Sequence, residues 1–97
     1  MKDHRAHIDW PRLLGDIQYL LGDIPPGEMV IVPVGQVRLA AYLEMSRGTV
    51  RRWIEEDAEP RHFDGEHLID VWIRLTGKRR EFLPIRVVSL SAAKLTA

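Results

Sequence analysis

Apolar residues recur at helical spacing in four segments of the chain, which are separated by turns rich in proline, glycine and acidic residues. In the first segment, Trp10–Leu21, they repeat at intervals of three, four and seven residues, so one face of a helix is apolar. Asp9 is suited to cap this helix, Pro11 to occupy its first turn, and the run that begins at Pro25 to end it. Residues 1–8 are polar, and we expect them to fray.

Two shorter helical stripes follow in the middle of the chain, over Gln36–Leu43 and about Arg47–Glu56. The turn between them, residues 44–46, is too short for antiparallel packing, so the two helices must cross steeply. Met45 is expected to insert from this turn into the core, and Ser46 is suited to cap the second helix. The pattern predicts a helix-turn-helix.

A further helix is expected after Pro60, with Asp64 as its cap, Glu66 in its first turn and Thr76-Gly77 at its end. Apolar residues cover more than half of its circumference, which predicts a central place in the core. These residues are Leu68, Ile69, Val71, Trp72, Ile73 and Leu75.

Two β-branched segments, residues 28–34 and 84–90, predict short strands, and Pro33 restricts the first to a sheet edge. We expect these two strands to pair with each other, because an unpaired apolar strand promotes aggregation. Pairing of 84–90 with its copy in a second chain stays open. The predicted fold is mainly α, with four or five helices and two short strands in a single domain over residues 1–97.

Composition narrows the classes of function. The chain has 14 Lys+Arg and 14 Asp+Glu, hence no formal net charge, and this balance argues against a histone-like coat or a polybasic membrane anchor. It has no cysteine, which excludes disulfides and cysteine-based metal sites. His4 and His7 have a metal-ligand spacing, but a frayed terminus is a poor place for a site.

The chain shows no acid–base pair, nucleophile arrangement or glycine-rich phosphate loop. We therefore expect no enzymatic activity, no cofactor, no metal and no small-molecule ligand. No apolar leader follows the first residues, and no apolar run approaches the roughly 18 residues of a membrane span. A cytoplasmic protein without membrane contact is the expectation.

Charge is unevenly distributed along the chain. Residues 1–35 carry 3 basic and 5 acidic side chains, residues 36–73 carry 5 and 8, and residues 74–97 carry 6 and 1. The C-terminal extension, residues 78–97, is therefore basic. Its first cations are suited to phosphates, although a solvated loop explains them equally well. They are Lys78, Arg79 and Arg80.

The helix-turn-helix segment also carries a recognisable order of residue types. The order is Gln36, Leu39, Ala40, Leu43, Glu44, Met45, Ser46, Thr49, Val50, Arg51, Arg52 and Trp53. Over roughly residues 9–77 the chain resembles the lambda-repressor/Cro-like (XRE-type) helix-turn-helix family. The resemblance implies a repressor-like DNA-binding domain with its motif at 36–56. The family usually has glycine at the position of Glu44, so a positive φ there would carry a small penalty. The linker 22–35 is longer than the family's.

The second helix of the motif separates apolar residues from basic ones. Val50, Trp53 and Ile54 share one face, and three arginines occupy the other. In the family, the first, second, fifth and sixth residues of this helix face the bases, which implies Arg47, Gly48, Arg51 and Arg52. Short polar side chains near helix N-termini are suited to bind phosphates, as are the three cations of the C-terminal extension. The polar residues in such positions are Gln36, Ser46 and Thr49.

The arginine face also admits a plainer interpretation. Arg51 with Glu55 and Arg52 with Glu56 have the spacing of helical ion pairs on a solvated surface. Glu55 is expected to orient an arginine rather than to accept from cytosine. The acidic run 55–59 should repel phosphate and confine binding to the first half of the helix.

We expect a small transcriptional regulator of the phage or bacterial Cro/repressor type. A single recognition helix buries little surface, so a homodimer on palindromic double-stranded DNA is expected, with repression as the simpler outcome. An antitoxin-like or phage accessory protein that also binds a protein partner is the second hypothesis. A protein-interaction module without DNA binding is the third.

Overall fold

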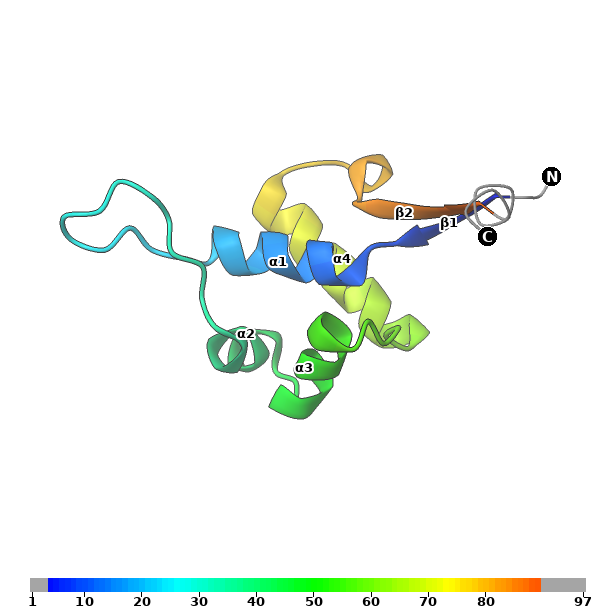
Figure 1. Ribbon diagram of the computed structural model, residues 1–97, viewed down its shortest axis with the longest axis horizontal. Coiled ribbons are helices and arrows are strands. Elements are labelled where there is room, and N and C mark those ends of the chain that lie inside the picture. The colour runs from blue at the N-terminus through cyan, green and yellow to red at the C-terminus, as the bar shows by residue number, and fades with distance from the viewer. Residues whose placement is uncertain (1–3, 90–97) are drawn as a thin grey trace, which may run out of the picture.

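Four helices dominate the computed structural model, which describes residues 4–89 (Figure 1). The helices are α1 (Trp10–Leu20), α2 (Gln36–Leu43), α3 (Arg47–Glu55) and α4 (His62–Thr76). A 3-10 turn, η1 (Arg80–Phe82), and two strands, β1 (His4–Ile8) and β2 (Ile85–Ser89), complete the described chain. The predicted mainly α fold is confirmed. Among the described helices, none is long and apolar enough to cross a membrane.

The core lies where α1 meets the other three helices. Every helix contributes the apolar face that its periodicity predicts, and Val34 adds one residue from the segment before α2. Trp72 is the largest buried side chain, and its indole N–H donates to Asp16 Oδ2 over 3.0 Å, so its one polar group is satisfied. The buried residues are Leu13, Leu14, Ile17, Val34, Leu39, Ala40, Leu43, Val50, Trp53, Leu68, Ile69, Val71 and Trp72.

The start of α4 differs from the expectation. The helix begins at His62, with Arg61 at the cap position and no side-chain cap bond, while Asp64 lies in the first turn. The predictions that Asp64 caps this helix and that Glu66 lies in its first turn are therefore wrong. Close packing fixes this end of α4 instead, because a Cβ on Gly65 would lie 3.1 Å from the Trp10 ring.

The strand predictions are corrected in two respects. β2 confirms a strand within 84–90, but its antiparallel partner is β1, in a register from His4↔Ser89 to Ile8↔Ile85. Residues 4–8 therefore form a strand instead of fraying, and the bond from Asp9 N–H to the Pro84 carbonyl, 2.9 Å, continues the pairing. A short polar sequence carries little local strand signal when its partner lies at the other end of the chain.

Residues 22–34 form a loop that projects from the body between α1 and α2 (Figure 1, cyan). The strand predicted at 28–34 is reduced to one bridge, in which Asp23 and Val32 exchange two backbone hydrogen bonds of 3.3 and 2.8 Å. Pro33 has no N–H to extend it. Gln18 holds the end of the loop, because its side chain donates to the Val34 carbonyl over 2.9 Å.

Candidate nucleic-acid interface

A left-handed residue makes the turn between α2 and α3. Glu44 has φ 59° and ψ 43°, so the small penalty that a positive φ would carry at this position applies. The following N–H, of Met45, donates to the Ala40 carbonyl over 3.0 Å and closes the end of α2. Met45 packs against the core from the turn, as predicted. α3 is thereby packed against α2 with Val50 and Trp53 buried.

Ser46 caps α3, which confirms its predicted role. Its Oγ accepts from the Thr49 N–H over 3.1 Å and donates to Thr49 Oγ1 over 2.7 Å. Arg52 Nη2 lies 3.5 Å from the same Thr49 oxygen. Both hydroxyls that were expected to bind phosphate are thus already engaged with each other.

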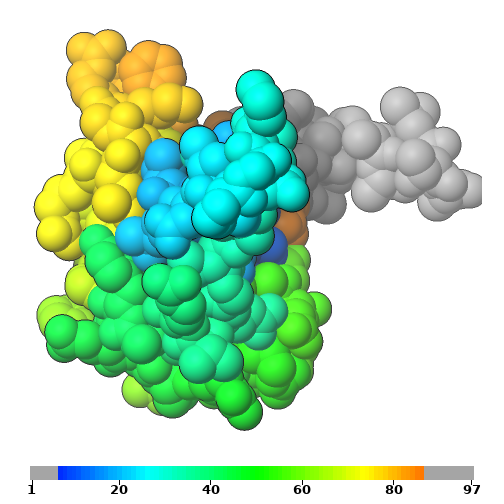
Figure 2. Space-filling model, turned by 90° about the vertical axis from the view of Figure 1, so that its left-hand side faces the viewer, coloured from blue at the N-terminus to red at the C-terminus, as the bar shows by residue number. Residues whose placement is uncertain are grey.

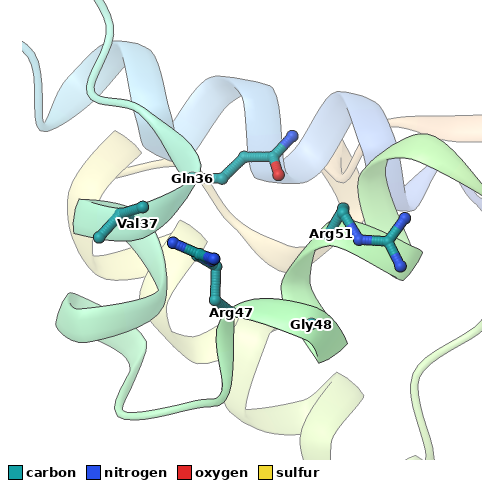
Figure 3. A pocket seen from close by; sticks show the side chains of 5 residues that line it. All are labelled: Gln36, Val37, Arg47, Gly48 and Arg51. Carbon is teal, nitrogen blue, oxygen red and sulfur yellow. The ribbon is translucent and has the colours of Figure 1, made fainter.

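The start of α2 and the first turns of α3 line an open surface pocket of about 480 Å³, which is called the hollow below (Figure 3). Four of its five lining residues were predicted as site residues. The fifth, Val37, was not anticipated. Its side chain is 58% exposed, and the available signal was an apolar residue on the polar side of α2. The lining residues are Gln36, Val37, Arg47, Gly48 and Arg51.

The three arginines of α3 differ in their partners. Arg51 Nη1 lies 3.0 Å from Glu56 Oε2 and 3.8 Å from Glu55 Oε1. The predicted pair between Arg52 and Glu56 is not formed. Glu56 lies at the C-cap of α3, and its carboxylate is paired with Arg51. Within residues 4–89, neither Arg47 nor Arg52 is part of an ion pair, so two arginines present uncompensated charge beside the hollow.

Glu55 connects α3 to α2. Its Oε2 accepts a hydrogen bond of 3.0 Å from Nε2 of Gln36, the first residue of α2. Glu55 therefore interacts with the side-chain amide of Gln36 as well as with the guanidinium of Arg51. The sequence suggested the arginine from helical spacing but gave no indication of the amide, because the two residues are 19 positions apart.

The predicted cations after α4 lie apart from α3. Figures 1 and 2 show the segment around η1 on the upper side of the molecule and α3 on the lower side. Arg80 donates two hydrogen bonds, of 3.1 and 2.9 Å, to the Glu66 carboxylate, and these bonds hold the pKa of Glu66 below its ordinary value. Arg79 pairs with Glu81 over 2.8 Å. The structure therefore does not bring Lys78, Arg79 and Arg80 together with the hollow.

Among the side chains that the structure describes, no group of three or more metal-ligating residues is gathered. Comparison of the chain with protein-family models, with curated proteins and with solved structures found no match.

Proposed function

We propose that this protein is a small sequence-specific DNA-binding regulator that places the first half of α3 in the major groove. The observation that carries the proposal is the hollow at the start of α2 and α3, which Arg47 and Arg51 line together with exposed Gly48. A major groove accepts an α-helix, and arginine bonds bidentately to guanine O6 and N7. The resemblance to the lambda-repressor/Cro-like family agrees with this assignment.

Base contacts are assigned to Arg47, Arg51 and Arg52, with Gly48 allowing close approach. Carboxylates gather at the far end of α3, where Glu55 and Glu56 are exposed and Asp57 follows them. These charges repel phosphates and confine DNA to the N-terminal half of the helix.

The regulator acts as a homodimer on a palindromic operator, because nine residues of α3 bury too little surface for tight binding by one protomer. Occupation of an operator by a protein of this size blocks competing proteins, so repression is the proposed outcome. The cytoplasm is the corresponding location.

The deciding experiment is in vitro selection of duplexes from a random library, followed by affinity measurements on the selected site. We expect a palindromic sequence. Arg52→Ala should relax the preference at one position in each half-site and cost about 1–3 kcal/mol. Arg74→Ala is the matched control, since it removes an exposed arginine from the far end of α4. Equal selectivity in both variants would contradict the assigned surface.

A second candidate function is a protein-interaction module, either alone or, as in an antitoxin-like or phage accessory protein, together with DNA binding. The exposed apolar side chains of the loop favour it, above all Met29, which is 92% exposed, with Ile24 and Val30. Titration with duplex DNA at low salt separates the candidates. If micromolar protein forms no complex, the regulator is excluded and the interaction module is favoured.

A further inference from the structure

One hydrogen bond fixes which end of the Gln36 amide faces the hollow. Nε2 of Gln36 donates to Oε2 of Glu55 over 3.0 Å. A carboxylate accepts hydrogen bonds and has none to donate, so the NH₂ group of Gln36 must face Glu55. Figure 3 shows the consequence, with the amide oxygen turned towards the space between the labelled side chains and the nitrogen turned away from it.

Glu55 is itself held in place from the other side. Its second oxygen, Oε1, lies 3.8 Å from Nη1 of Arg51, so one carboxylate lies between the amide of α2 and a guanidinium of α3. Arg51 is in turn held by Glu56 over 3.0 Å. The orientation of Gln36 is thus part of a connected network.

The hollow consequently presents a mixed set of groups to a ligand. Gln36 offers an acceptor, Arg47 and Arg51 offer donors, and Val37 offers an apolar surface. A phosphate has only acceptor oxygens, which the amide oxygen repels. Base edges in the major groove combine acceptors with amino groups: guanine O6 and N7 lie beside the N4 amino group of cytosine, and adenine N7 lies beside its N6 amino group.

We propose that Gln36 reads a base by accepting a hydrogen bond from the exocyclic amino group of cytosine or adenine, and that Glu55 is the positioning residue for its amide. The proposal rests on the function proposed above. It also changes the role assigned to Gln36, from a donor to phosphate into an acceptor from a base.

The test compares selected duplexes and affinities for the wild-type protein and Gln36→Ala. We expect Gln36→Ala to lose the preference for cytosine or adenine at one position per half-site, by about three- to tenfold, with the other positions retained. A uniform loss of affinity across sequences, with every preference intact, would assign Gln36 to phosphate and overturn the proposal.

Glu55→Gln tests the positioning role, because glutamine donates as well as accepts and no longer dictates the orientation of the Gln36 amide. We expect a weakened preference at the same position, and no further weakening there in the double variant Gln36→Ala/Glu55→Gln. Glu59→Gln is the matched control, since Glu59 is exposed and, among the described residues, belongs to no ion pair that involves Arg51 or Glu55. If Glu55→Gln lowers the thermal stability but leaves the selected sequence unchanged, Glu55 only holds α2 and α3 together, and its role in positioning the Gln36 amide is refuted.

The two proposed roles fail in different ways. If the wild-type protein binds no duplex at low salt, the regulator function and the reading role of Gln36 both fall. If it selects a site and Gln36→Ala selects the same site with the same preferences, only the reading role of Gln36 falls.

Discussion

At the scale of single residues, the glycines within helices differ in whether packing inside the protein explains them. Gly65 has a steric reason in the protein itself, because a Cβ there would lie 3.1 Å from Trp10. Gly48 has none, since the nearest atom to a Cβ is an Arg52 nitrogen at 3.9 Å. Glycine inside a helix costs about 0.5–1 kcal/mol relative to alanine, so packing explains neither Gly48 nor Gly15. Gly48 differs from Gly15 in lining the hollow that we propose as the DNA site.

Gly48→Ala should therefore affect stability and binding in opposite directions. We expect the free energy of unfolding to rise by about 0.5–1 kcal/mol, from helix propensity, while DNA affinity falls because the methyl group occupies the hollow. Gly15→Ala in α1 is the matched control, because a Cβ there meets no atom within 4 Å and the site is outside the hollow. Urea melts and DNA titrations measure both effects. A binding loss of equal size in Gly15→Ala would contradict the assignment.

Glu44 has a backbone conformation with a positive φ, and this conformation has an energetic cost. A non-glycine residue in the left-handed region is disfavoured by about 1–2 kcal/mol, and glycine removes that penalty. Glu44→Gly should raise the midpoint of urea unfolding, although the greater freedom of glycine in the unfolded chain offsets part of the gain. Glu59→Gly, in an irregular segment where φ is negative, should lower the midpoint instead. A lower midpoint in both variants would show that Glu44 is not strained.

At the scale of elements, the sequence predicts what local periodicity determines. The apolar faces of α1 to α4 follow from the spacing of their apolar residues. The predicted three-residue turn lies at residues 44–46 in the structure as well. β1 could not be predicted in this way, because its partner β2 lies at the other end of the chain, with Ile8 paired to Ile85. For the same reason the bond from Gln36 to Glu55 could not be predicted, since it joins side chains of two different helices. Four of the five residues that line the hollow, and the pair of Arg51 with Glu55, could be named from the sequence, but Val37 and the bond from Gln36 to Glu55 could not.

Glu66 links α4 to η1 and makes this interaction dependent on pH. Arg80 lowers the pKa of Glu66 from an ordinary value of 4.5. A carboxyl group with a lower pKa in the folded chain stabilises the fold above its unfolded pKa and loses that contribution as the pH falls through its folded pKa. Glu66→Gln should therefore melt at a lower temperature than the wild type at pH 7, with the difference disappearing in acid below pH 4.5.

Thermal melts followed by circular dichroism from neutral to acid pH provide the measurement. Glu59→Gln is the control, since Glu59 is exposed and, among the described residues, takes part in no ion pair. A deficit of Glu66→Gln that persisted at low pH would show that charge is not its cause.

At the scale of the whole molecule, Arg86 ties together three distant parts of the chain. Its guanidinium in β2 binds Asp57, which follows α3, and Asp9, the N-cap of α1, the latter over 3.1 Å. Asp57 contributes most to raising the pKa of Arg86 above its ordinary value, and Asp9 adds to it. The β1–β2 pair is thus attached to the body through exposed charge.

Arg86→Met should loosen this attachment while leaving the helical core intact. We expect faster amide hydrogen exchange in β1 and β2, because the ion pairs are removed, with the slow amides of α1 and α4 unchanged. Arg74→Met is the control, since Arg74 is exposed and, in the part of the chain described, is part of no ion pair. Equal acceleration in the strands and helices would mean that Arg86 supports global stability instead.

The distribution of charge over the molecule provides the last prediction. The chain is formally neutral, and its basic segment 78–80, which leads into η1, lies on the side of the molecule opposite α3 (Figures 1 and 2). Removing one cation that binds a DNA phosphate should reduce the slope of log affinity against log salt by about 0.9. Because only the side formed by α2 and α3 is expected to meet DNA, the double variant Lys78→Ala/Arg79→Ala should retain the wild-type slope, whereas Arg47→Ala should weaken binding. A slope reduced by about 3.6 in the double variant, which removes two cations from each protomer of the dimer, would show that DNA reaches both sides of the protein, and the proposed interface would then extend beyond the hollow.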